Sequence, residues 1–220
     1  MNRLFGIIFI TFLASCKNNP ETLGIQLPTE DFTTRTIKLA DSLGTVNINR
    51  PSRYDTSFTW THYSDCGKRC EKIKYRFQPS ILKIVEESGW IWDNEPKDST
   101  ERLTISHSGY FPFGDKSDSL LIHSFHRVRK ESIAQQPFSY PIKSDTIEKI
   151  GNRFFSIILI DTYDSTFMLY AKKLQAMANI KNNEVYFDFE LFTKQTSPTA
   201  DNFINNAYAY LRSVRIDSAK

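Results

Sequence analysis

Alternation of apolar and polar residues dominates the middle and the end of the chain. Residues 72–78, for example, place Ile73, Tyr75 and Phe77 on one side, with polar residues between them. A period of two is typical of a strand with one buried face. The same alternation predicts further strands over residues 45–49, 57–63, 101–107 and 184–192.

Longer apolar runs predict further strands. Residues 153–161 are almost uninterrupted in apolar character, which is typical of a central strand, and residues 167–180 follow as another strand. Asn182-Asn183 comes just before the alternating residues 184–192, and this order predicts a tight hairpin. Residues 80–87 fit either a strand or a short helix, and we favour a strand.

Two segments change to a helical period. In residues 117–135, Leu121, Phe125, Val128 and Ser132, flanked by Ile122 and Ile133, fall on one side of a helical wheel, as in a helix with one face toward the protein. Ser197-Pro198 then opens a second helix, since proline is tolerated at the first helical position. Its predicted buried face contains Phe203, Ala207 and Leu211.

The N-terminus follows a different pattern. Arg3 precedes a short apolar stretch over residues 4–13, which is too short to span a hydrocarbon layer of about 30 Å. Leu13-Ala14-Ser15-Cys16 then resembles the lipobox of bacterial lipoprotein signal peptides. The resemblance implies that a diacylglycerol is attached to Cys16 and that cleavage occurs just before it. The alternative is an ordinary secretion signal with Cys16 as a structural cysteine.

A lipid on Cys16 would decide where the protein works. Two acyl chains are enough for stable attachment to a bilayer without a transmembrane segment. We therefore expect an envelope lipoprotein that faces the periplasm or the cell surface. Lys17 follows Cys16, where an aspartate would signal retention at the inner membrane, so the resemblance favours the outer membrane. The expected division is a signal peptide over residues 1–15, a lipidated cysteine with a flexible tether over 16–35, and a single α/β domain over 36–220.

The cysteines allow two interpretations. If Cys16 carries lipid, Cys66 and Cys70 remain as a pair. An oxidising compartment favours a disulfide between them, which would staple a hairpin. The alternative is a metal-handling site for Cu(I) or Zn, in which His62 joins the two thiolates.

No segment carries a catalytic motif. The sequence contains no nucleophile elbow, no glycine-rich phosphate loop and no H-E-x-x-H. His123 and His126 are spaced for a metal, but nearby Arg127 and Lys130 favour a solvated basic face. Asp188 and Glu190, on one strand face, are expected to meet solvent. A hydrolase with a site dispersed over loops stays an alternative.

Composition narrows the class of partner. The formal net charge is +3, and loss of Arg3 with the signal brings the chain closer to neutrality. Nucleic-acid binding calls for a more basic domain, so we expect no nucleic-acid partner. No cofactor is expected beyond the covalent lipid.

The order of the predicted elements resembles the Mog1/PsbP-like group. The resemblance depends on an early strand, GTVNINRPSRY, on the long final hairpin, IKNNEVYFDFELF, and on a last helix, AYAYLRSVRI, that ends in a short strand. It implies an α+β fold, in which a curved, mostly antiparallel sheet is packed between helices. Members act as binding or assembly modules and share no catalytic residues. We therefore expect a non-catalytic lipoprotein that binds an envelope protein.

Overall fold

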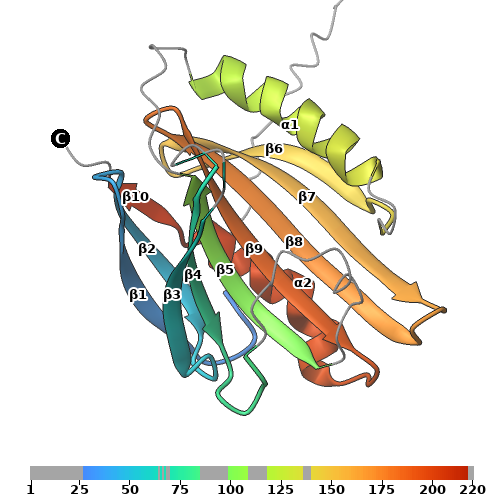
Figure 1. Ribbon diagram of the computed structural model, residues 1–220. Helices are drawn as coiled ribbons and strands as arrows, with labels where there is room; N and C mark the ends of the chain where they lie inside the picture. The colour runs from blue at the N-terminus through green and yellow to red at the C-terminus, as the bar shows by residue number, and fades with distance from the viewer. Residues whose placement is uncertain are drawn as a thin grey trace, which may run out of the picture.

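The computed structural model is an α+β structure built from two antiparallel sheets and two helices (Figure 1). It describes residues 27–63, 65, 67, 70–84, 99–108, 118–135 and 140–217. In this part of the chain, no helix combines the length and the apolar character needed to cross a membrane.

Seven strands form the large sheet, and all neighbours are antiparallel. In spatial order they are β3 (Thr56–His62), β4 (Lys72–Gln78), β5 (Thr100–Ser108), β9 (Asn183–Thr193), β8 (Leu169–Ile180), β7 (Arg153–Asp164) and β6 (Ser144–Ile150). The small sheet has the order β1 (Phe32–Leu39), β2 (Gly44–Pro51) and β10 (Arg215–Asp217). Among the strands of the described residues, both sheets are open, and each has two edge strands.

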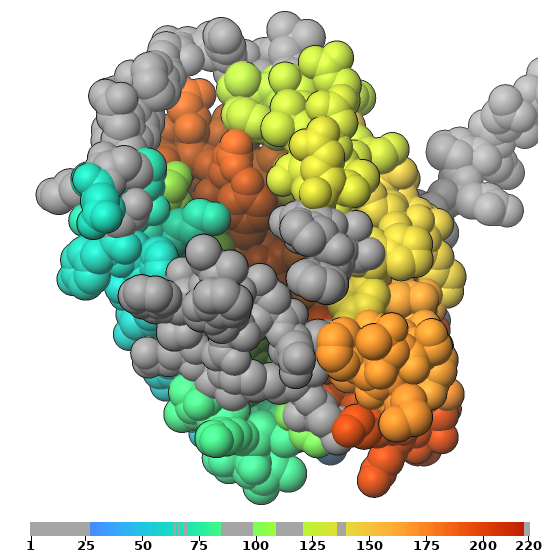
Figure 2. All heavy atoms as spheres, turned by 45° about the vertical axis from the view of Figure 1, so that its right-hand side comes forward, coloured from blue at the N-terminus to red at the C-terminus, as the bar shows by residue number. Residues whose placement is uncertain are grey.

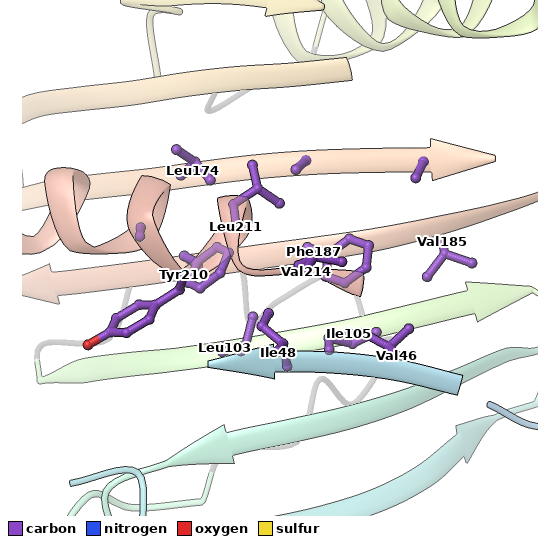
Figure 3. Close-up of a cluster of buried hydrophobic side chains, with 14 of the residues drawn as sticks. Val46, Ile48, Leu103, Ile105, Leu174, Val185, Phe187, Tyr210, Leu211 and Val214 are labelled. Atoms are coloured by element: carbon purple, nitrogen blue, oxygen red, sulfur yellow. The ribbon is translucent and has the colours of Figure 1, made fainter. Parts of the chain in front are cut away.

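The helices lie on opposite faces of the large sheet. α1 (Asp118–Ala134) packs on β6, β7 and β8, whereas α2 (Pro198–Arg212) packs on β8, β9 and β2. The main core lies between the large sheet, α2 and the small sheet (Figure 3). Phe187 on β9, Ile48 on β2 and Leu211 on α2 meet there, and each is fully buried.

Local signals explain why α2 begins where it does. The Ser197 side chain accepts a hydrogen bond from the Ala200 backbone N–H at 3.1 Å, which satisfies one of the free donors at the helix start. Pro198 occupies the first turn, where its missing N–H costs nothing. Phe203, Ala207 and Leu211 are buried, so the predicted face of this helix is confirmed.

The β8–β9 hairpin forms one residue earlier than predicted. Lys181 and Asn182 have positive φ angles of 49° and 63°, as a tight hairpin turn requires, whereas Asn183 already pairs with Ile180. The expected turn at Asn182-Asn183 was therefore displaced by one position. Asparagine tolerates positive φ well, and because Asn182 and Asn183 are consecutive asparagines, both were candidates for the turn.

Other boundaries also differ from the predictions. β1 begins at Phe32, inside the segment that we predicted as a tether over residues 16–35. Thr29, ahead of this strand, is already held in place, because its backbone N–H donates to Asn206 Oδ1 at 2.9 Å. Residues 80–84 form a turn and irregular chain, so the strand predicted over 80–87 is wrong there, and its remainder lies outside the described residues. The charged strand β6 had no predicted counterpart.

The face of α1 that meets the sheet was predicted only in part, since Leu121 and Phe125 of the predicted side are half-buried. Val128 is 53% exposed and Ser132 is exposed, whereas Ile122 is buried and His126 and Arg129 reach the sheet. Polar side chains on this face bind to polar groups of β7. A helical wheel based only on apolar residues therefore leaves out the polar residues that reach the sheet.

Candidate functional site

The two faces of the large sheet differ sharply in chemistry. On β9, Phe187 and Phe189 point into the core, and the residues between and beside them, Tyr186, Asp188 and Glu190, point to the other face. We call that second face the polar face. It is the face that α1 covers at the β6–β8 end.

A hollow lies over part of the polar face. Figure 2 shows β8 and β9, in orange, at the bottom of a recess between α1 and the cyan strand β3. Of the polar-face side chains on these strands, Gln175, Tyr186 and Asp188 are partly exposed, whereas Glu190 is buried. The described side chains of these strands define what the recess offers to a ligand.

One row of hydrogen-bonding groups crosses the polar face. The strand register aligns Arg76 with Thr104, Thr104 with Asp188, and Asp188 with Gln175. The Arg76 Nε donates to Thr104 Oγ1 at 3.2 Å, although Arg76 is only 1% exposed. Burying a guanidinium is costly unless it is paired or stacked, so this row is held in a defined arrangement.

Aromatic rings supply part of that arrangement. The Arg76 Cζ lies 4.7 Å from the centre of the Trp60 ring, and the Lys74 Nζ lies 5.6 Å from the same centre. Phe58 stacks beside Trp60 with ring centres 5.2 Å apart. The β3 end of the polar face thus pairs cations with partly exposed aromatic surface.

A second row consists of three charges. The Glu190 carboxylate binds Arg102 Nε at 2.6 Å and Lys173 Nζ at 3.0 Å. Burial alone would raise the pKa of Glu190, but Lys173 and Arg102 outweigh it and lower this pKa to about 2. Glu190 is therefore a buried anion between two cations. The prediction that Glu190 meets solvent is wrong.

At the α1 end, three side chains form a chain that resembles a catalytic triad. His126 Nδ1 lies 2.8 Å from Ser156 Oγ, and His126 Nε2 lies 2.8 Å from Asp145 Oδ2. A nucleophilic serine needs its oxygen within reach of a substrate, however, and Ser156 has no exposed surface. Arg129 Nη1 also donates to Ser156 Oγ at 2.7 Å. In this structure the three side chains hold α1 against the sheet.

These contacts correct the expectation of a solvated basic face on α1. His123 and Arg127 are exposed as expected, but His126 bonds to the sheet and Lys130 Nζ binds Asp145 Oδ2 at 2.9 Å. The pKa of Asp145 is lowered, first by the hydrogen bond from Lys130 and then by the one from His126. The contacts of α1 with Asp145 on β6 could not be foreseen because β6 was not predicted.

The residues singled out for lipidation, a disulfide or metal binding are only partly described. Cys16 and Cys66 lie outside the described residues, so lipidation and the Cys66–Cys70 disulfide stay predictions. His62 ends β3 and is exposed, as is Cys70. Among the described residues, no three side chains of metal-ligating type lie together. Cys66 is not one of these residues, so the metal-handling alternative also stays a hypothesis.

The polar face itself was missed by the sequence analysis. Its signal was present in the alternation of β9, where charged residues oppose buried phenylalanines. Only the pairing of β9 with β5 brings Glu190 to Arg102, which lies 88 residues earlier in the chain. Sequence periodicity gives the face of a strand but not its neighbours.

Known proteins were compared with this one by sequence and by structure. No model of a protein family matches the sequence, and no curated protein matches it either. Among solved structures, cyanobacterial PsbP (CyanoP) from Synechocystis sp. PCC 6803, determined in solution, aligns with a TM-score of 0.47 and 8% sequence identity. The alignment covers 89% of this chain and 99% of that chain. What this protein binds must be inferred from its own residues.

Proposed function

We propose that this protein is a lipid-anchored, non-catalytic binding module of the bacterial cell envelope, and that its polar face receives the ligand. The lipid on Cys16 attaches it to a bilayer, with the outer membrane favoured over the inner membrane. The ligand belongs to a protein of the same envelope. No nucleic acid and no cofactor other than the lipid take part.

The anchor is supported by the sequence Leu13-Ala14-Ser15-Cys16 after a short apolar stretch. Two acyl chains on one cysteine satisfy the two-signal requirement for stable membrane binding. Attachment through the lipid does not require the domain itself to insert into the bilayer, so the domain can work at a distance from it. The residues that join Cys16 to β1 provide that distance.

The binding role depends on one observation, the two rows of buried polar groups across the middle of the large sheet. A sheet face that only packs is normally apolar, because each buried polar group costs free energy unless it is paired. Here Arg76, Thr104 and Glu190 are each less than 10% exposed. Preorganised charges and hydrogen-bonding groups beside partly exposed aromatic rings are typical of sites that fix a polar ligand.

The non-catalytic part of the proposal has separate support. Within the described residues, the Ser156, His126 and Asp145 chain is the arrangement closest to a catalytic site, and its serine is buried. The hydrolase alternative would need that serine to become exposed. Membership of the PsbP-like group, which we also propose, agrees with a binding role, and β2, the β8–β9 hairpin, α2 and β10 occur in the expected order.

Co-purification of the full-length protein from detergent-solubilised membranes tests the binding role. Gln175 lies in the first row and is partly exposed, so Gln175→Leu should reduce the recovered partner severalfold without lowering the melting temperature. Gln195→Leu makes the same change at an exposed position after β9 and should leave recovery unchanged. Equal recovery with both variants would contradict a ligand site on the polar face.

A further inference from the structure

The edge strands of the two sheets differ in how they are protected. At one edge of the large sheet, β6 carries Asp145, Glu148 and Lys149, and α1 packs beside it. The outer strand of the small sheet, β1, carries two cations, Arg35 and Lys38. Such charges discourage pairing with another chain.

The opposite edge of the large sheet lacks this protection. β3 reads Thr-Ser-Phe-Thr-Trp-Thr-His, with no acidic residue, no lysine or arginine and no proline. Threonine and aromatic residues favour strands, so the segment presents a regular, uncharged edge. Figure 1 shows β3 at the border of the large sheet, and in the described part of the chain β4 is its one strand partner.

Side chains of β3 remain accessible. Ser57 and Thr59 are exposed, and Phe58 and Trp60 are partly exposed. Tyr63, directly after the strand, is 76% exposed. A strand at the edge of a sheet with accessible side chains can accept one more strand by main-chain pairing.

The residues of β3 are symmetric about Thr59 in chemical type. An antiparallel pair centred on Thr59 would place Phe58 opposite Trp60 of the second copy and Ser57 opposite Thr61. Opposite residues in an antiparallel pair share a face, so aromatic rings would meet aromatic rings and hydroxyl groups would meet hydroxyl groups. No like charges would face each other along the segment from Thr56 to Thr61.

We propose that two copies of this protein associate through antiparallel pairing of their β3 strands, centred on Thr59. The two-fold symmetry of such a contact uses the same strand on both copies, as most homodimers do. The rings of Phe58 and Trp60 from each copy form one continuous aromatic stripe beside Arg76 and Lys74. The two large sheets become one.

The contact is small and therefore reversible. A pair of seven-residue strands buries less than the ~1,200 Å² at the lower end of stable interfaces. Attachment to a membrane would favour the contact by raising the effective concentration of one copy near another. For this reason the test uses the full-length chain in the membrane rather than a dilute solution.

Photo-crosslinking between two differently tagged copies tests the contact. A benzoylphenylalanine at Ser57 would lie opposite Thr61 of the second copy and should give an adduct that contains both tags. Thr59→Lys in both copies places two like charges opposite each other, and so does Thr59→Glu, so each should reduce the adduct severalfold. Mixing one copy of each should restore it, because lysine then faces glutamate.

Thr34→Lys, at an exposed position of β1, is the control for added charge and should leave the adduct unchanged. Absence of a doubly tagged adduct would overturn the proposal, as would an adduct formed with a different protein. An adduct that persists with Thr59→Lys, or that is not restored by the mixture, would overturn pairing centred on Thr59. The mixture contains the same two variants that are tested separately, so a small loss of stability in either variant would not explain restoration of the adduct.

Discussion

Glu190 belongs to the proposed binding face and also contributes to stability. Its carboxylate is buried between Arg102 and Lys173, and the low pKa of about 2 follows from that position. Removing one member of a buried ionic group leaves the others without compensation, which costs more than the group contributes as a whole.

Glu190→Gln should lower the free energy of unfolding by about 3 kcal/mol at pH 7, because Arg102 and Lys173 then face a neutral amide. A folded-state pKa that is lowered from 4.5 to about 2 contributes stability above the unfolded-state pKa and loses it as the pH falls. The difference between wild type and variant should therefore shrink from about pH 4.5 down to about pH 2. Denaturant unfolding across this range measures it. Glu131→Gln, at an exposed position on α1, removes a carboxylate in the same way and should change the free energy of unfolding at pH 7 by less than about 0.5 kcal/mol.

Ser156 should matter for stability. Ser156→Ala removes an acceptor for Arg129 and a partner of His126, both of which are partly buried, and should cost about 1–3 kcal/mol. Ser124→Ala, an exposed change on α1, should shift the free energy of unfolding by less than about 0.5 kcal/mol. Thermal melts of the two variants compare them. A silent Ser156→Ala would mean that these bonds do not hold α1 in place.

At the scale of whole elements, the sequence predicted α2 and most strands, missed β1 and β6, and predicted α1 only in part. The range of β4 agrees residue for residue with the prediction, and α2 has both its start and its buried face as expected. Apolar periodicity succeeds in these elements because apolar residues make their contacts. α1 also bonds to β7 through His126 and Arg129, and such polar contacts do not contribute to an apolar period.

The docking of α2 can be tested with two aspartate variants. Phe203 is 4% exposed within the main core, so Phe203→Asp places a carboxylate against apolar residues and should cost at least about 3 kcal/mol. Asn205 is exposed on the same helix, and Asn205→Asp should be nearly silent. Thermal melts decide between the two expectations. Equal shifts would contradict the packing of α2 on the large sheet.

At the scale of the whole molecule, the proposed anchor and the polar face are independent features. Order along the chain predicted a mostly antiparallel α+β fold, but it could not predict the polar face, because that face is assembled from β4, β5, β9 and β8. Their pairing joins residues that are far apart in sequence. A lipid anchor, in contrast, is a local signal that four consecutive residues carry.

The anchor predicts a simple change of location. Cys16→Ala should abolish incorporation of a fatty-acid analogue and release the protein from the membrane fraction, because the lipid is the proposed attachment. Cys70→Ala should leave labelling and fractionation unchanged. Label on the Cys16→Ala variant, or an unlabelled wild type, would contradict lipidation at Cys16.

The most direct test of the binding role compares two tyrosines on opposite sides of the large sheet. Tyr186 on the polar face and Tyr208 on α2 are both partly exposed, and each lies under an arginine, so benzoylphenylalanine replaces the same residue type in similar surroundings. After irradiation of intact cells, we predict an adduct with an envelope protein from position 186 and none from position 208. Equal adducts from both positions, or none from position 186, would contradict a ligand site on the polar face.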